Sequence, residues 1–371
     1  MFSNSCVTKI LALVLGAITM VTCAYANPAA ETVASLGLKE SDVAARDMPG
    51  WKRPERIVVR VDAGRLAWLA EVAEGVELVV VADHTEAVER VGGADAIIGY
   101  CSEEILASGD DLHWIQLPYA GVEDCLVIDA VQTRDLLVTN AQRIYGPAIA
   151  EHVMAMTLAF SRGLDVFRHE QTRASWNPGA IGQESSLWEL SDKTMLVVGL
   201  GGIGTEVARR AAALGMTVTA TRASSRKGPD FVSYVGLSDE LLELAAKADV
   251  VVNSLPLTPQ TADLFDAGFF AAMKPTAYFI NVGRGKSVVT NDLLLALQEG
   301  HIAGAGLDVT EPEPLPSDHP LWEQPNVIIT PHISAGSDLR VERLWIVMRE
   351  NLRRYIAGEP MLSVVDVDRG Y

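Results

Sequence analysis

Three polar side chains with complementary chemistry follow apolar segments in the C-terminal half of the chain: Arg284, Glu313 and His332. The planar guanidinium of an arginine can hold a carboxylate and polarise a neighbouring carbonyl oxygen. A histidine can give that oxygen a proton near neutral pH, and a carboxylate bonded to its far nitrogen fixes the tautomer. Each residue alone would more often be structural. Together they predict acid/base chemistry at a carbonyl beside a carboxylate, with these three as the catalytic residues.

The elements that must position these side chains are the strands of two parallel sheets. Short β-branched runs alternate with helix-length segments, which indicates right-handed crossovers. The predicted fold class is α/β, with two doubly wound parallel-sheet domains, the second a Rossmann dinucleotide-binding domain. Ligands of such sheets bind beyond the carboxyl ends of the strands, so the three side chains are expected in one cleft.

The domain boundaries follow from the same pattern. Residues 55–160 form the predicted substrate-binding domain, completed by a C-terminal helix within 338–371, and residues 161–337 form the dinucleotide-binding domain. The predicted strands are 57–61, 77–82, 94–99, 113–117 and 136–139 in the first domain, and 195–199, 217–221, 250–253, 277–282, 303–309 and 327–330 in the second. Long helices are expected at 148–164 and 339–356.

A glycine-rich turn marks the dinucleotide site. The apolar run 195–198 leads directly into Gly199-Leu200-Gly201-Gly202-Ile203-Gly204, and a helical pattern follows. The first glycine permits the tight turn, the second lets a pyrophosphate approach the backbone, and the last lets the helix pack closely on the strand. The helix N-terminus offers N–H groups to the phosphates. The predicted cofactor contacts here are Gly199, Gly201, Gly202, Ile203 and Gly204.

The next predicted strand ends in Thr221-Arg222 and continues as a basic loop that includes Ser225 and Arg226. It lacks the carboxylate that would accept hydrogen bonds from the ribose hydroxyls of NAD. Because arginine can grip a 2′-phosphate with two hydrogen bonds, Arg222, Ser225 and Arg226 favour NADP as the cofactor. A solvated basic loop would have the same composition, so NAD is the alternative.

Composition excludes some classes of partner. A formal net charge of −18 over 371 residues leaves no basic face for nucleic acid or anionic lipid. No cysteine or histidine spacing matches a metal site, and no metal is needed if Arg284 polarises the carbonyl. The sequence leaves open whether Cys101 and Cys125 pair.

The first 26 residues have the organisation of a secretory signal peptide. Lys9 precedes an apolar run at 10–21, and Ala24-Tyr25-Ala26 supplies a small-x-small cleavage site. This predicts a periplasmic or secreted protein with no membrane anchor after cleavage, and a cytoplasmic protein with an N-terminal extension is the alternative. Export would separate the protein from the soluble cofactor pool.

These motifs together resemble the D-isomer-specific 2-hydroxyacid dehydrogenase family over about residues 57–356. The matching segments are 198–204, 255–258, 281–285, 306–309 with 313–314, and 331–334. The resemblance implies an enzyme, assembled as a homodimer, that interconverts a small 2-keto acid and a D-2-hydroxy acid, as the glyoxylate and hydroxypyruvate reductases do.

The resemblance also implies roles for individual residues. Asp308 would lie near the nicotinamide and Pro256 near the adenosine, and the backbone of loop 119–123 would hold the substrate carboxylate. Without the resemblance that loop reads equally well as an ordinary turn. The implied cofactor contacts beyond the glycine turn are Pro256, Val282, Arg284, Asp308 and His332, and the implied substrate contacts are Ala120, Gly121, Val122, Arg284 and His332.

Two alternatives share this fold. One is oxidation of a smaller anion such as formate or phosphite, although Glu313 stands where formate-oxidising relatives carry glutamine. The other is a catalytically silent protein that senses nucleotides. The intact set of Arg284, Glu313 and His332 disfavours the silent alternative, and turnover would decide between the two.

Overall fold

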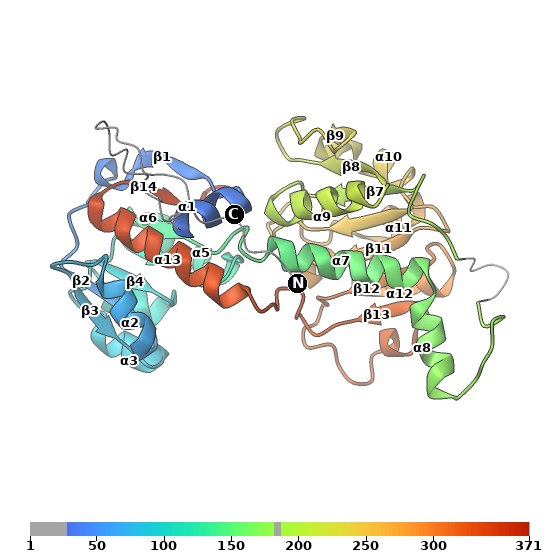
Figure 1. The fold of residues 1–371 in the computed structure, drawn as a ribbon, viewed down its shortest axis with the longest axis horizontal. Coiled ribbons are helices and arrows are strands. Elements are labelled where there is room, and N and C mark those ends of the chain that lie inside the picture. Colours follow the sequence, from blue (N-terminus) through green and yellow to red (C-terminus); the bar gives the residue numbers. More distant parts are fainter. Residues whose placement is uncertain (1–27, 182–186, 371) are drawn as a thin grey trace, which may run out of the picture.

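The computed structural model describes residues 28–181 and 187–370. Two lobes stand side by side, each built on a parallel sheet (Figure 1). We call the sheet of β2–β6 with its helices and the C-terminal helix the first lobe, and the sheet of β7–β13 with its helices the second lobe. The α/β class predicted from the sequence is confirmed. The predicted signal peptide, residues 1–26, lies outside the described residues.

The second lobe has the strand order β13-β12-β11-β10-β7-β8-β9, with every neighbouring pair parallel. Its order reverses beside β7, which creates a crevice at the carboxyl ends of β7 and β10. Both faces are buried: Val197 packs in the core on one side and Leu196 in the core on the other. The strands are β7 (Thr194–Val198), β8 (Thr217–Thr221), β9 (Tyr234–Gly236), β10 (Val250–Asn253), β11 (Tyr278–Asn281), β12 (Gly304–Leu307) and β13 (Val327–Ile329).

The first lobe has a five-stranded sheet in the order β3-β2-β4-β5-β6, also parallel throughout. Val58 and Ile57 point into cores on opposite faces, which explains the continuous apolar runs in the sequence. The strands are β2 (Arg56–Val59), β3 (Glu77–Val80), β4 (Ala96–Ile98), β5 (Trp114–Gln116) and β6 (Leu137–Thr139).

Helices cover both sheets and cross between the lobes. The long helix α7 leads from the first lobe to the second and packs along α9, while α13 returns to the first lobe and buries Met348, Leu352 and Tyr355 against its sheet (Figure 1). The helices are α1 (Pro28–Leu36), α2 (Ala63–Ala70), α3 (His84–Arg90), α4 (Glu103–Ser108), α5 (Glu123–Leu126), α6 (Asp129–Thr133), α7 (Gly146–Ser161), α8 (Leu164–Thr172), α9 (Gly202–Ala213), α10 (Leu241–Ala245), α11 (Ala267–Ala272), α12 (Thr290–Gln298) and α13 (Arg340–Ala357). Short 3-10 turns cover Ala45–Asp47, Ser238–Glu240, Gly285–Ser287 and Pro320–Glu323.

The two ends of the described chain are tied together on the first lobe. Strand β1 (Glu40–Ala44) pairs antiparallel with β14 (Pro360–Leu362), and α1 packs against α13. Residues 28–54, which the sequence assigned to neither domain, therefore belong to the first lobe. Within the described residues no helix is both long and apolar enough to cross a bilayer.

A disulfide joins the loop after β4 to helix α5 at the carboxyl edge of the first sheet. Cys101 follows β4 and Cys125 lies in α5, which follows β5, and the two sulfurs are bonded with their Cα atoms 5.6 Å apart. The sequence left this pairing open. The bond restrains the position of α5 relative to the loop after β4.

Candidate active site at the junction of the lobes

The glycine turn connects β7 to α9. Gly199 has φ +94°, a conformation that side-chain-bearing residues rarely adopt, and a Cβ on Gly204 would overlap the carbonyl oxygen of Gly199. A Cβ on Gly201 would meet no atom within 4 Å, so the backbone there is open to a bound group. Because α9 starts at Gly202, its first N–H groups have no partner within the helix. This cradle fits the pyrophosphate of a dinucleotide, with the helix N-terminus as the anion site.

The basic loop after β8 divides its arginines between two environments. Arg222 folds back onto the glycine turn, and its Nε and Nη2 donate to the Leu200 carbonyl at 3.2 and 2.8 Å. Arg226 instead forms an ion pair with Glu240 at 2.6 Å and donates to the Tyr234 hydroxyl. Ser225 accepts a hydrogen bond from a backbone N–H two residues on. Of the predicted 2′-phosphate contacts, Arg222 therefore stands directly at the turn, and the charge of Arg226 is already matched.

A second arginine, which was not among the predicted site residues, lies at the same turn. Arg143 follows β6 with φ 68°, and a Cβ on Gly202 would lie 2.6 Å from its Cγ. Burial lowers the pKa of Arg143, and the neighbouring charge of Arg222 lowers it further. The two guanidinium groups thus share one electrostatic environment beside the dinucleotide cradle. No local motif marks Arg143, because only the tertiary fold brings it to the glycine turn.

The segment after β10 packs against the glycine turn. Ser254 donates to the carbonyl of Gly199 at 2.8 Å, and a Cβ on Gly199 would meet the Leu255 side chain. Pro256 follows directly, and its carbonyl accepts a hydrogen bond from Thr261 at 2.7 Å. Pro256 therefore lies in the loop that packs on the glycine turn.

Arg284 stands two residues after the buried Val282, beyond the end of β11. The Asn281 side chain fixes this turn by donating to the Arg284 carbonyl at 3.1 Å and accepting from Gly283 N–H at 3.1 Å. The Arg284 guanidinium reaches the other lobe, where a Cβ on Gly121 would collide with it. The loop that contains Ala120, Gly121 and Val122 follows β5. Predicted substrate contacts from two lobes therefore meet.

His332 lies on a turn that a buried carboxylate holds in place. Asp308, 2% exposed, accepts hydrogen bonds from the Thr330 hydroxyl at 2.7 Å and from the N–H groups of Ile333 at 2.9 Å and Ser334 at 3.1 Å. Burial alone would raise the pKa of Asp308, but hydrogen bonds from Ser334, Thr330 and Ile333 outweigh it and hold the pKa below its ordinary value. The clamp fixes His332, which has φ 51°.

His332 and Glu313, which the sequence predicted as partners, lie in contact. His332 Nδ1 lies 2.6 Å from Glu313 Oε1, and the two side chains are 50% and 41% exposed. With Nδ1 hydrogen-bonded to the carboxylate, Nε2 is left to face a substrate. His152 is instead bonded to the Thr330 hydroxyl at 3.0 Å, so it supports the turn rather than the chemistry.

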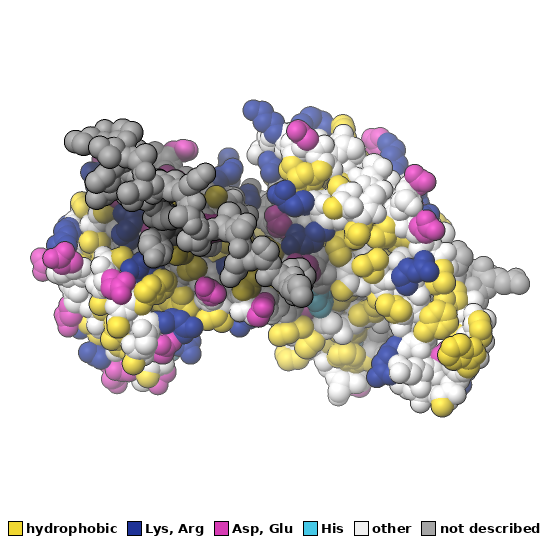
Figure 2. All heavy atoms as spheres, viewed as in Figure 1, with side chains coloured by type: hydrophobic (Ala, Val, Ile, Leu, Met, Phe, Trp, Pro, Cys, Tyr) yellow, Lys and Arg dark blue, Asp and Glu magenta, His cyan; other side chains and the backbone are white. Residues whose placement is uncertain are grey.

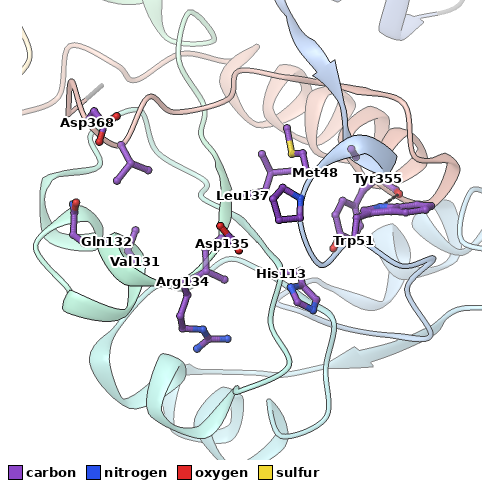
Figure 3. Close-up of a pocket in the computed structure, with 14 residues that line it drawn as sticks. Met48, Trp51, His113, Val131, Gln132, Arg134, Asp135, Leu137, Tyr355 and Asp368 are labelled. Atoms are coloured by element: carbon purple, nitrogen blue, oxygen red, sulfur yellow. Dashed lines mark hydrogen bonds between the residues drawn. The ribbon is translucent and has the colours of Figure 1, made fainter.

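Charged side chains gather where the lobes meet, and Figure 2 shows basic, acidic and histidine side chains at that junction. A separate cavity of about 330 Å³ lies elsewhere in the first lobe, between Trp51, His113, Arg134 and Tyr355 (Figure 3). It borders the amino ends of β5 and β6, the edge opposite the loops described above, and none of the three catalytic candidates lines it. Among the described residues, no cluster of three or more His, Cys, Asp and Glu side chains could hold a metal ion.

A Rossmann-type sheet with an open glycine cradle, and an arginine and a His–Glu pair that follow strands of that sheet, are the features of an NAD(P)-dependent dehydrogenase. The model of the D-isomer specific 2-hydroxyacid dehydrogenase NAD-binding domain matches residues 154–334. Glyoxylate/hydroxypyruvate reductase A from Photorhabdus laumondii is 31% identical over 72% of this chain and 84% of its own length. Glyoxylate reductase/hydroxypyruvate reductase from Mus musculus is 34% identical over 69% of this chain and 78% of its own.

A solved structure of a reductase of the same kind is also similar to this chain. The NADPH-dependent glyoxylate/hydroxypyruvate reductase of Sinorhizobium meliloti, in complex with NADP and sulfate, superposes with a TM-score of 0.73 at 28% identity, over 85% of this chain and 100% of that one. The chain belongs to the D-isomer specific 2-hydroxyacid dehydrogenase family and is an NAD(P)-dependent oxidoreductase of that family.

Proposed function

We propose that the protein reduces small 2-keto acids, of the glyoxylate and hydroxypyruvate kind, to D-2-hydroxy acids with NADPH. The observations that carry this proposal are the meeting of Arg284 with the Gly121 loop and the bonded His332–Glu313 pair. Arg284, Glu313 and His332 follow β11, β12 and β13 at the carboxyl edge of the same parallel sheet. A guanidinium beside a loop backbone suits a carboxylate, and an imidazole bonded to a glutamate suits a carbonyl oxygen that needs a proton.

Each residue has a distinct role in the reducing direction. Bound NADPH supplies the hydride that reduces the carbonyl carbon. Arg284 orients the carboxylate and stabilises negative charge on the carbonyl oxygen. Protonated His332 donates from Nδ1 to Glu313, 2.6 Å away, and gives its Nε2 proton to the oxygen. Closer approach of the lobes would remove water from the half-exposed His332–Glu313 pair and strengthen its interactions.

Arg222 and Arg143 support the choice of NADPH over NADH. Arg222 directly follows β8, where the 2′-phosphate of the cofactor is expected, and no carboxylate ends that strand. The charge of Arg143 acts on Arg222 and adds to the positive potential there. The similar reductase of Sinorhizobium meliloti is NADPH-dependent, which agrees with this choice. NADH is the alternative that the test below separates.

The test is a turnover assay on the protein from Asn27 onward. NADPH and NADH are compared with glyoxylate, hydroxypyruvate, pyruvate and phenylpyruvate, by the absorbance of the reduced nicotinamide. We expect NADPH to be preferred, and His332→Ala to lose nearly all turnover while still binding NADPH. Preference for NADH would contradict the cofactor assignment alone. Tight NADPH binding without turnover of any acid would contradict the enzymatic proposal.

We also propose that the protein acts outside the cytoplasm, in the periplasm or after secretion. The pattern of residues 1–26 supports export, and the Cys101–Cys125 disulfide is of a kind that persists in oxidising compartments. Cell fractionation with N-terminal sequencing tests this, and full-length protein in the cytoplasm would contradict it. The homodimer stays a prediction, which analytical ultracentrifugation can test.

A further inference from the structure

Every nitrogen of the Arg284 guanidinium already has a partner within the protein. Nε lies 2.9 Å from Oε1 of Glu123, and Nη2 lies 3.5 Å from Oε2 of the same carboxylate. Nη1 donates to the Gly283 carbonyl at 2.9 Å. Glu123 therefore faces the Nε–Nη2 edge of the guanidinium, which is an edge that grips carboxylates through two parallel hydrogen bonds.

The pair links the two lobes at the substrate site. Glu123 is the first residue of α5, directly after the loop proposed to bind the substrate carboxylate, whereas Arg284 follows β11 of the second lobe. A Cβ on Gly121 would lie 2.6 Å from Glu123 Oε2 and would overlap the Arg284 guanidinium. The Glu123 carboxylate thus occupies the space between the loop and the arginine, where a substrate carboxylate would have to bind.

We propose that Glu123 is an internal stand-in for the substrate carboxylate, which the substrate must displace from Arg284 in order to bind. This inference rests on the proposed function, because it assumes a substrate whose carboxylate binds to Arg284. Among the residues that the structure describes, Glu123 forms an ion pair with no cation other than Arg284. Substrate binding therefore exchanges one carboxylate for another on the same guanidinium.

The exchange makes binding depend on the charge of the ligand. The displaced Glu123 stays attached to the loop, beside Asp124, and Glu313 is bonded to His332, the proposed proton donor to the substrate. Burial and the charge of Asp124 raise the pKa of Tyr119, which places Asp124 close to the same loop. A substrate with one carboxylate meets less repulsion from these groups than one with a second anionic group. Glu123 is thus a specificity-determining residue that favours monoanionic 2-keto acids.

The test measures binding of two unreactive probes to the enzyme–NADPH complex. Oxamate is a monoanion shaped like a 2-keto acid, and oxalate is a dianion of similar size. Glu123→Gln keeps the size of the side chain and removes its charge, and Glu123→Ala removes the side chain. Asp124→Asn removes a neighbouring charge that has no hydrogen bond to Arg284, and is the matched control.

We expect Glu123→Gln to lower the Kd of oxamate by roughly fivefold to tenfold, in line with the loss of a competing, partly exposed ion pair. The Kd of oxalate should fall more than the Kd of oxamate, because repulsion from Glu123 acts on both charges of oxalate. Glu123→Ala should tighten both ligands as well, and Asp124→Asn should change the Kd of oxamate by less than about twofold. A role of Glu123 limited to structure would not produce a gain that grows with ligand charge.

Weaker or unchanged binding of oxamate in both Glu123 variants would overturn the proposal, because Glu123 would then not compete for Arg284. An equal gain in the affinity for oxamate in Asp124→Asn would also overturn the proposal. Turnover of glyoxylate and hydroxypyruvate by the wild-type enzyme is measured in parallel. Turnover with unchanged probe binding would refute the stand-in and leave the proposed function intact, whereas no turnover by any form would refute the proposed function.

Discussion

The buried carboxylate of Asp308 offers a direct test of how the fold positions His332, the proposed proton donor. In Asp308→Asn the side-chain shape is kept, but one oxygen is replaced by an NH2 group that cannot accept a hydrogen bond. In the wild-type protein, Oδ1 of Asp308 accepts from Thr330 and Ile333, and Oδ2 accepts from the Ser334 N–H. The asparagine can serve only one of these two sets.

The size of the expected loss of stability follows from the N–H group that loses its acceptor in Asp308→Asn. Ser334 is 6% exposed, so its N–H cannot turn to bulk water. A buried donor left without a partner costs about 1–3 kcal/mol, and we expect a loss of that size in the free energy of unfolding. The turn that carries His332 should also shift, and a displacement of about 1 Å in a catalytic group can lower kcat by roughly 100-fold.

The pH dependence of this loss has a definite sign. The folded-state pKa of Asp308 is held below its ordinary value by hydrogen bonds that outweigh burial. Its ionised form therefore stabilises the fold above the unfolded-state pKa of about 3.9, and this stabilisation disappears as the pH falls through the lower, folded-state pKa. The stability difference between the wild type and Asp308→Asn should thus be full near neutral pH and shrink in acid.

The assay combines urea unfolding with steady-state kinetics. Asp249→Asn is the matched control, because Asp249 binds the Thr194 N–H at 2.9 Å and Lys274 at 3.0 Å at the amino edge of the same sheet. The control should lose stability and keep its kcat. In a His332→Ala background, Asp308→Asn should lower kcat no further. An unchanged kcat in Asp308→Asn, or a further loss in the double variant, would refute the positioning argument.

Three other predictions follow from the site and its supports. Glu313→Gln removes the charged partner of His332 and should lower kcat by about 10- to 100-fold with little change in the Kd of NADPH, measured by stopped-flow and fluorescence titration. Arg222→Asp should shift the ratio of kcat/KM for NADPH over NADH by at least about tenfold towards NADH, and an unchanged ratio would remove Arg222 from the cofactor site. Replacing Cys101 and Cys125 by serine opens a link between residues 24 apart in sequence, which should cost about 3 kcal/mol in guanidinium unfolding, and no loss would mean that the bond does not restrain the unfolded chain.

Most strands of both sheets could be predicted, because a strand buried on two faces reads as an apolar run. The edge strand β9 (Tyr234–Gly236) was not predicted, since it has three residues, of which one is an exposed tyrosine and one a glycine. Residues 250–253 were predicted as a strand, and β10 covers the same residues. The pairing of β1 with β14 could not be predicted. Glu40–Ala44 is short, polar and largely exposed, and its partner lies at the other end of the chain. Such a strand exists only because α1 and α13 bring the two segments together.

The residues of the candidate site also differ in whether the sequence could predict their position. Arg284, Glu313 and His332 could be placed at one edge of the second sheet, because each follows a strand whose carboxyl end lies there. Contacts that depend on the other lobe gave no signal in the sequence. The Arg284–Glu123 ion pair joins residues 161 apart, and Arg143 reaches the glycine turn through a left-handed backbone conformation. These contacts depend on how the lobes pack, which no local pattern records.

The carboxylate of Glu123 also explains how the charge of Arg284 is stabilised in this site when no substrate is bound. The Arg284 side chain is 31% exposed, so water satisfies it only in part, and an unpaired charge there would be costly. Glu123 removes that cost and holds the first lobe against the second before the substrate arrives. Because the substrate replaces one carboxylate by another, the guanidinium keeps a partner throughout, and little of the binding energy is lost in desolvating it. An enzyme built this way would select its substrate by charge at the moment of exchange, before any contact with His332.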